Sequence, residues 1–310
     1  MISPVPDAVA AEARAFNAKL EAMLATQPSV HTLPAELVRT ARRAGKGIFP
    51  PPVFLDDAAW VDANGVRLRV VRPPGAARGV YLHIHGGGWT LGAADMQDLH
   101  LRDLARATGL VAASVEYRLG PEHPFPAGPD DCETAARWLL DGGAQQLEAP
   151  AHFAIGGESA GAHLAALVLV RLRERRGFFA ANLVYGAFDL GMTPSQRAWG
   201  ERNLVLSRPI IEYFANCFLP GTTLDQRRAP AISPLYADLT GLPPALFTVG
   251  TLDPLLDDSL FMHARWQIAG NAATLRVWPH AIHGFNGFDL ELGRISDRDQ
   301  FAFLTRYLPT

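Results

Sequence analysis

The sequence has few cysteines and no long apolar run. Among its 310 residues only Cys132 and Cys217 are cysteines, and they lie far apart without a CxxC or Cys/His pattern. A disulfide framework and a structural zinc site are therefore poorly supported, and we expect two free thiols in a reducing cytoplasm. The longest stretch without a charged side chain, residues 79–94, is interrupted by histidines and glycines. It does not provide the roughly 20 apolar residues of a membrane span.

The sequence also lacks an excess of charge of either sign. Its 28 lysines and arginines nearly balance 31 aspartates and glutamates. Neutralising phosphates requires a basic surface, so nucleic acid is not expected as a partner. The N-terminal segment has acidic residues where a signal peptide has a basic patch followed by an apolar run. We therefore expect a cytoplasmic protein without a membrane span.

Short β-rich runs alternate with helical stretches after the proline run at residues 50–52. The predicted strands are Val66–Val71, Val80–Ile84, Leu110–Val115, Phe153–Ile155, Leu183–Tyr185, Ala245–Val249 and Leu275–Trp278. The predicted helices between and after them include Pro129–Leu140, Ala160–Arg175, Leu255–Ala269 and Asp297–Tyr307. This alternation predicts an α/β fold with a mostly parallel central sheet and helices on both faces.

Two segments depart from the alternation. The first 45 or so residues have apolar side chains at helical intervals, and about residues 188–230 carry aromatic residues at helical spacing but no clear strand. We interpret the second segment as an insertion. A single domain is expected, with its core formed by residues 52–187 and 231–310.

A G-x-S-x-G pattern follows one predicted strand and opens a predicted helix. It reads Gly157-Glu158-Ser159-Ala160-Gly161. A serine on such a sharp strand-to-helix turn needs small neighbours, and its hydroxyl then projects clear of the backbone. This context favours Ser159 as a nucleophile over a serine that only caps a helix.

A glycine run follows another predicted strand and reads His85-Gly86-Gly87-Gly88-Trp89. Consecutive glycines let backbone N–H groups face a ligand, and a carbonyl oxygen that becomes an oxyanion needs such donors. Gly86 and Gly87 are the candidate donors. His83 and His85 are two residues apart on a strand, but no third metal ligand is evident, so a metal site is not expected.

These motifs resemble those of the hormone-sensitive-lipase-like family of α/β-hydrolase carboxylesterases. The matching segments span residues 80–286: HGGGW from His85, YRLGPEHPFPA from Tyr117, GESAGAHLAA from Gly157, SPL from Ser233, LPP from Leu242, DPL from Asp253 and HGF from His283. Gly120, Glu158 and the pair Ala162-His163 depart from the usual pattern without removing a reacting group. The resemblance implies an α/β-hydrolase fold, no metal or organic cofactor, and a small-molecule ester as substrate.

The resemblance also implies a helical cap over the site, formed by residues 1–45 and about 188–230. Substrate choice is then expected to depend on this cap, with short to medium acyl chains preferred and Tyr213, Phe214 and Phe218 as candidate pocket walls. Relatives often dimerise, so a homodimer is a further expectation.

A base and an acid must follow Ser159 in the order serine, acid, histidine. Spacing does not distinguish His280 from His283, because both follow the predicted strand Leu275–Trp278. The resemblance to the H-G-F segment favours His283. Asp253 follows a strand at the sheet edge where functional groups gather. Its competitors Asp257 and Asp258 lie in the first turn of a helix, where carboxylates favour the helix dipole.

These residues predict a serine esterase with a covalent acyl intermediate. Ser159 is the nucleophile, His283 the base and Asp253 the acid that orients it. The N–H groups of Gly86, Gly87 and Ala160 form the oxyanion hole. The alternatives are an amidase, lactonase or acyltransferase that uses the same site, or a binding protein without catalysis.

Overall fold

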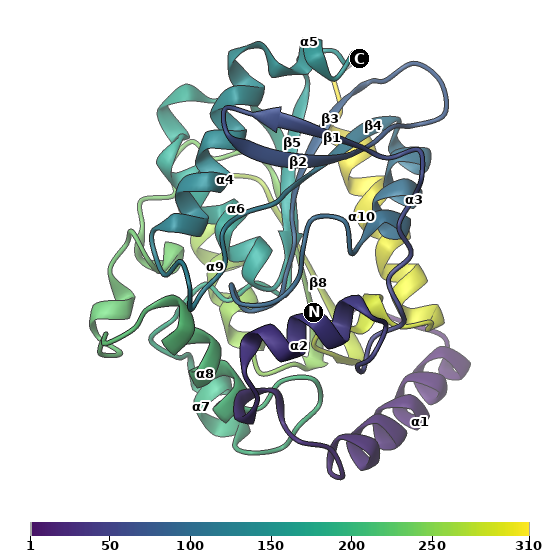
Figure 1. Cartoon of the computed structure of the whole chain (residues 1–310), viewed down its shortest axis with the longest axis vertical. Coiled ribbons are helices and arrows are strands. Elements are labelled where there is room, and N and C mark those ends of the chain that lie inside the picture. Colours follow the sequence, from purple (N-terminus) through teal and green to yellow (C-terminus); the bar gives the residue numbers. More distant parts are fainter. Residues whose placement is uncertain (1, 310) are drawn as a thin grey trace.

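One eight-stranded sheet forms the centre of the protein in a computed structural model that describes residues 2–309 (Figure 1). The strands are β1 (Ala59–Ala63), β2 (Val66–Val71), β3 (Gly79–Ile84), β4 (Leu110–Val115), β5 (Phe153–Glu158), β6 (Phe178–Val184), β7 (Ala245–Leu252) and β8 (Ala273–Ile282). Their order is β1-β2-β4-β3-β5-β6-β7-β8, and only the β1–β2 and β2–β4 pairs are antiparallel. The predicted mostly parallel sheet is confirmed.

Helices cover both faces of this sheet. They are α1 (Asp7–Leu24), α2 (Ala35–Arg43), α3 (Asp98–Thr108), α4 (Ala127–Trp138), α5 (Ala144–Gln146), α6 (Ala160–Arg171), α7 (Pro194–Trp199), α8 (Arg208–Phe218), α9 (Leu256–Ile268) and α10 (Glu291–Tyr307). Helices α4, α6 and α9 pack on one face, and α3 and α10 on the other. Within residues 2–309, no helix is both long and apolar enough to cross a bilayer.

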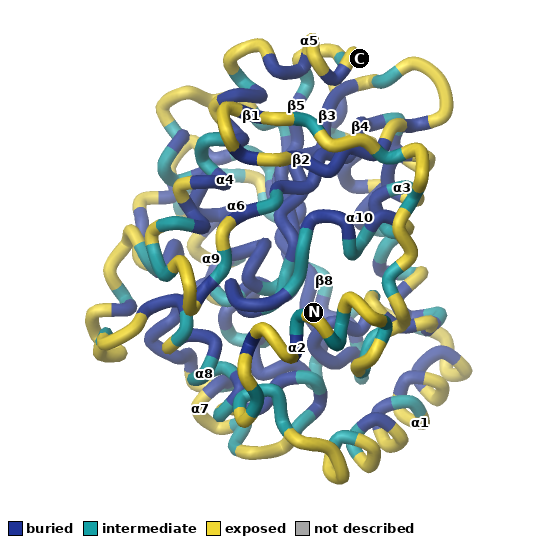
Figure 2. Tube along the Cα trace, viewed as in Figure 1, coloured by how far each residue is buried: buried dark blue, intermediate teal, exposed yellow. Residues whose placement is uncertain are grey.

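The central strands are buried on both faces, as Figure 2 shows in dark blue. In β3, Val80, Leu82 and Ile84 join the core under α4 and α6, whereas Tyr81 joins the core under α3 and α10. Successive strand side chains point to opposite faces, so a strand covered twice is apolar at almost every position. This is why the middle strands were predicted from short apolar runs.

Other elements were not predicted. Strand β1 is an edge strand whose residues are mostly exposed, so it has no apolar run. Helix α3 was missed although Leu101, Leu104 and Ala105 are buried at helical spacing. Strand β6 begins at Phe178, five residues before its predicted start.

The N-terminal segment has two parts with different contacts. Helix α1 packs against β8 and α10, and Ile2 forms a parallel bridge with Val277 of β8. Figure 1 shows α1 at the lower edge of the molecule, with α2 nearer its centre. Helix α2 is held by Arg39, which donates hydrogen bonds to the carbonyl oxygens of Thr90 at 2.7 Å and Gly120 at 2.7 Å.

The insertion that carries α7 and α8 is anchored by a buried carboxylate of α9. One oxygen of Asp258 accepts hydrogen bonds from the backbone N–H groups of Phe188 at 2.7 Å and Asp189 at 2.9 Å. The other accepts from the Thr193 hydroxyl at 2.8 Å and the Gln196 amide at 2.7 Å. Burial nevertheless raises the pKa of Asp258 to about 7, because these donors only partly offset the lost hydration.

We expect Asp258 to make stability depend on pH. An unfolded aspartate titrates near a pKa of about 3.9, so between that value and about 7 the native state binds the proton more tightly. The free energy of unfolding, relative to Asp258→Asn, should therefore be highest near pH 4 and fall as the pH rises towards 7. Urea unfolding of both proteins across this range measures the difference. Parallel pH profiles would contradict the prediction, and Asp257→Asn on the same helical turn is the matched control.

Candidate active site

Ser159 lies on a sharp turn between β5 and α6, with φ of 57° and ψ of −120°. A non-glycine residue adopts this conformation only under strain, which recurs at functional sites. The turn is pressed against the end of β3: a Cβ atom on Gly157 or on Gly161 would collide with the carbonyl oxygen of Ile84. Glycine at both positions is therefore needed for the turn to form.

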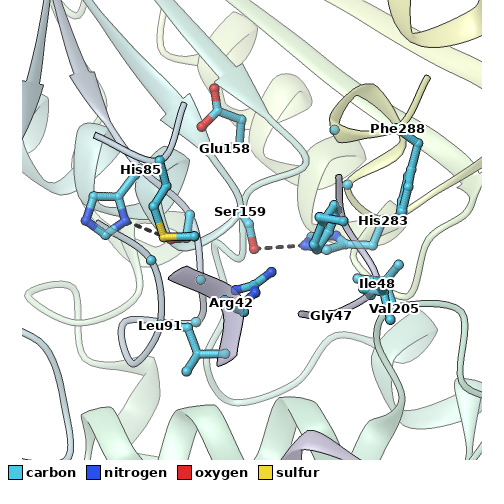
Figure 3. A pocket seen from close by; sticks show the side chains of 18 of the residues that line it. Arg42, Gly47, Ile48, His85, Leu91, Glu158, Ser159, Val205, His283 and Phe288 are labelled. Atoms are coloured by element: carbon cyan, nitrogen blue, oxygen red, sulfur yellow. Dashed lines mark hydrogen bonds between the residues drawn. The ribbon is translucent and has the colours of Figure 1, made fainter. Parts of the chain in front are cut away.

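Asp253 and His283 are brought together by the register of β7 and β8. Leu252 and Ile282 are paired, so the next residue of each strand lies at the same edge of the sheet. His283 Nδ1 lies 2.9 Å from Asp253 Oδ2, and His283 Nε2 lies 2.8 Å from Ser159 Oγ (Figure 3). An ionised carboxylate only accepts hydrogen bonds, so Nδ1 carries the proton and Nε2 accepts the serine hydroxyl.

Neighbouring groups fix the positions of Asp253 and His283. Asp253 is 1% exposed, and its second oxygen accepts a hydrogen bond from the Leu255 N–H at 2.8 Å. The ring of Tyr185 lies 4.7 Å from that of His283. The Leu255 N–H stabilises the buried carboxylate of Asp253, and packing against Tyr185 fixes the orientation of the His283 ring.

His280, the alternative base, lies elsewhere. The Arg14 guanidinium donates to its Nε2 at 3.1 Å, and its backbone N–H donates to the Thr251 hydroxyl at 2.9 Å. Its carbonyl oxygen accepts from the Asn17 amide at 2.8 Å. His280 therefore joins α1 to the end of β8 and makes no contact with the serine.

The glycine loop after β3 lies beside Ser159. A Cβ atom on Gly86 would be 3.4 Å from the Ser159 Cβ. The carbonyl of Gly87 points away and accepts the N–H groups of Thr90 at 3.2 Å and Leu91 at 2.8 Å. In the described part of the chain, the N–H groups of Gly86, Gly87 and Ala160 donate to no other protein group. Three unpaired donors are thus available next to the serine hydroxyl.

His83 in β3 and His85, which follows the end of that strand, lie next to the glycine loop. His83 contacts the Ser114 hydroxyl through Nδ1 at 2.8 Å and Glu158 through Nε2 at 3.0 Å, so neither ring nitrogen is available to a metal. His85 stacks on Tyr117 at 4.3 Å, and its Nδ1 lies 2.8 Å from the Gly86 carbonyl oxygen. Burial lowers the pKa of His85 to about 4, so its ring is neutral at pH 7.

Trp89 has two roles, because it lines the cavity and belongs to the core. Its indole N–H donates to His163 Nδ1 at 2.9 Å, and its ring stacks on Phe218 at 4.8 Å. The His163 Nε2 lies 2.7 Å from the Ile232 carbonyl oxygen, and burial lowers the pKa of this histidine to about 4. A neutral His163 therefore donates at Nε2 and accepts the indole at Nδ1. The sequence patterns indicate His163 only as part of the Ala162-His163 departure from the family pattern and do not connect it with Trp89.

A cavity of about 990 Å³ opens in front of Ser159. Its wall is mainly apolar and includes Leu33, Val38, Ile48, Phe49, Leu91, Met96, Val205, Leu206, Ile210, Phe214 and Phe288. Of the three aromatic residues expected as walls, Phe214 lines this space, whereas Phe218 packs behind it on Trp89 and Tyr213 packs on Phe214. Arg42 and His100 also line the cavity, and sequence patterns did not indicate either residue.

A cluster of buried ionisable side chains borders the cavity next to Ser159. Glu158 lies 3.0 Å from His83 and 3.9 Å from His100, and His100 lies 3.6 Å from Asp297. Burial acts to raise the pKa of Glu158, but His83 and the other donors outweigh it, and the pKa is lowered. Burial acts to lower the pKa of His100, yet Asp297 and Glu158 raise it to about 9. Glu158 therefore stays ionised within a paired group and does not contact Ser159 or His283 as a second acid.

Comparisons with known proteins give one consistent result. The profile of a family described as an alpha/beta hydrolase fold matches residues 81–287. Carboxylesterase NlhH of Mycobacterium tuberculosis is 31% identical over 284 residues, which cover 87% of this chain and 89% of that protein. An ethyl acetate hydrolase of Pseudomonas putida is 30% identical over 273 residues, or 83% and 84% of the two chains. The crystal structure of an esterase from the bacterial hormone-sensitive lipase family superposes with a TM-score of 0.81 at 29% identity, covering 99% and 100% of the two chains.

The turn at Ser159 gives a test of packing. Gly161→Ala puts a methyl group into the Ile84 carbonyl, so β3 or α6 must move. We expect destabilisation by about 3 kcal/mol or more, measured by urea unfolding, because backbone atoms cannot relax as a side chain does. Gly270→Ala is the control: its φ is +84° but its surroundings are open, so a loss of only about 1–2 kcal/mol is expected. Equal losses in the two variants would show that the collision with Ile84 is unimportant.

Proposed function

This chain belongs to the hormone-sensitive-lipase-like family of α/β-hydrolase-fold proteins and is a carboxylesterase, and we propose that it hydrolyses esters with Ser159, His283 and Asp253 as its triad. One observation carries the proposal. The His283 ring bridges the serine at 2.8 Å and the aspartate at 2.9 Å, on the wall of a cavity large enough for a small ester.

The reaction proceeds through an acyl-enzyme. Ser159 Oγ attacks the ester carbonyl carbon while His283 Nε2 takes the hydroxyl proton, and Asp253 stabilises the imidazolium that forms. His283 then gives this proton to the leaving alcohol. Water, deprotonated by the same nitrogen, attacks the acyl carbon, and the acid leaves as Ser159 regains its proton.

The developing oxyanion is held by backbone N–H groups. The donors of Gly86, Gly87 and Ala160 have no other protein partner among the described residues, so they are free to bind negative charge. Each such donor contributes on the order of a hundredfold in rate. The three protein groups of the triad and these donors suffice for ester hydrolysis by this mechanism.

The cap covers this chemistry and limits substrate size. We assign to it the residues that line the cavity from the N-terminal segment, between Leu24 and Val53, and from the insertion, between Asn203 and Phe214. The mainly apolar wall favours short- to medium-chain acyl esters, in line with the ethyl acetate hydrolase among the relatives. A homodimer and a cytoplasmic location stay predictions.

The triad is tested by single substitutions. We expect Ser159→Ala and His283→Ala to abolish hydrolysis of p-nitrophenyl acetate, butyrate and octanoate, because the nucleophile or its base is removed. His280→Ala should retain activity, since that ring contacts Arg14 and not the serine. A fully active Ser159→Ala would contradict the proposal, and matched amide substrates distinguish an amidase from an esterase.

A second test addresses the orienting acid. In Asp253→Asn the amide can donate to Nδ1, so His283 is stabilised with its proton on the wrong nitrogen. We expect kcat for p-nitrophenyl butyrate to fall by about a thousandfold or more with KM little changed. Asp289→Asn is the control, because that carboxylate lines the cavity but pairs with Arg294. Retained kcat in Asp253→Asn would show that another group orients His283.

A further inference from the structure

Helix α2 carries three arginines whose surroundings differ. Arg39 donates to the Glu122 carboxylate at 2.8 Å as well as to two carbonyl oxygens. Arg43 makes a two-point ion pair with Asp95, at 3.0 and 2.7 Å. These contacts fix α2 on both sides of Arg42, which instead lines the cavity in front of Ser159. The position of Arg42 is thus set by its neighbours rather than by an ion pair of its own.

Arg42 is a partly buried charged group of the cavity wall that has no counter-charge among the described residues. No carboxylate of residues 2–309 lies within 4.0 Å of its guanidinium, and burial alone lowers its pKa, to about 10. It is fully charged at pH 7. Other charged groups of the cavity wall are paired: Glu158 with His83, Asp297 with His100, Asp103 with Arg102, Arg294 with Asp289, and Arg298 with Glu291. Lys46, also on the wall, is exposed to solvent.

The guanidinium is held close to the catalytic histidine by aromatic packing. It lies over the ring of Phe49, 5.1 Å from the centroid. Phe49 stacks on Phe288 at 4.7 Å and lies 3.1 Å from the Cβ position of Gly284, the residue after His283. Figure 3 shows Arg42 extending from α2 into the space in front of Ser159 and His283. One aromatic ring therefore separates the guanidinium from the loop that carries the base.

We propose that Arg42 binds a carboxylate of the substrate, so that the preferred substrates are esters with a carboxylate a few atoms from the scissile bond. This inference rests on the proposed function, since the same cavity and serine are involved. A guanidinium matches a carboxylate with two parallel N–H···O bonds. Partial burial strengthens the attraction, and the apolar wall around it holds the methylene chain between the ester and the carboxylate.

Two pairs of substrates test the proposal and the side on which the carboxylate lies. Monoethyl adipate and ethyl hexanoate differ only by a carboxylate in place of the terminal methyl group on the acyl side. The anion of 4-acetoxybutanoic acid and butyl acetate differ in the same way on the alcohol side. Hydrolysis of all four is followed in a pH-stat with the wild type, Arg42→Gln, Arg42→Lys and Arg208→Gln.

We expect Arg42→Gln to lower the kcat/KM ratio of anionic to neutral ester by roughly tenfold to a hundredfold in at least one pair. Arg42→Lys should lie between the wild type and Arg42→Gln, because it keeps the charge but not the two-pronged geometry. Arg208→Gln removes an exposed arginine that pairs with Glu212 on its own helix and lies off the cavity wall, so it should leave the ratio unchanged. The substrate pair whose kcat/KM ratio falls shows whether Arg42 binds a carboxylate on the acyl side or on the alcohol side of the ester.

The possible outcomes separate the two proposals. A wild type inactive on all four esters would contradict the proposed function itself. Activity on the neutral esters, with the same anionic-to-neutral ratio in the wild type and Arg42→Gln, would overturn the carboxylate site and leave the esterase intact. An equal fall in kcat/KM for both members of each pair in Arg42→Gln would also overturn the carboxylate site, because Arg42 would then only support the packing of Phe49.

Discussion

The contact between β3 and the turn after β5 is the constraint on which the site depends. The Ile84 carbonyl lies where a side chain at Gly157 or Gly161 would be, so the turn that strains Ser159 fits only with glycine at both positions. The same approach brings Gly86 alongside the serine, which places the proposed oxyanion donors and the proposed nucleophile within one small region. Strain at Ser159 is thus offset by packing of the sheet and not by contacts of the serine itself.

The proposed acid and base, Asp253 and His283, depend on a separate feature, the pairing of β7 with β8. Because Leu252 pairs with Ile282, a shift of either strand would separate Asp253 from His283. A few residues further on, Asp258 accepts four hydrogen bonds from the insertion. Two carboxylates on one short segment therefore have different partners: Asp253 faces a histidine, whereas Asp258 faces backbone N–H groups and side chains of the insertion.

The sequence predicted those parts of the site whose backbone geometry requires particular residues. Glycines around Ser159 and the run after β3 are needed for backbone reasons, so their pattern is readable without a structure. The choice of His283 over His280 rested on resemblance, because spacing alone does not show that His280 turns towards Arg14. Contacts between segments distant in the chain have no recognisable sequence pattern. The Trp89–His163 hydrogen bond and the position of Arg42, for example, depend on how the helices pack. Strand β1 was missed because edge strands need no apolar run.

The segments that we assign to a cap are joined to the rest of the chain through groups outside the proposed triad. Arg39 bonds to the Thr90 carbonyl, just after the glycine loop, and Gly88 lies against the ring of Phe214 from the insertion. Movement of α2 would therefore disturb both the cavity wall and the loop that offers the oxyanion donors. Arg42 lies between these anchors without sharing their contacts, so a change at this position alters the charge of the cavity while Arg39 and Arg43 keep α2 in place. The charge on the cavity wall can therefore change at position 42 without a change in the arrangement of Ser159, His283 and Asp253.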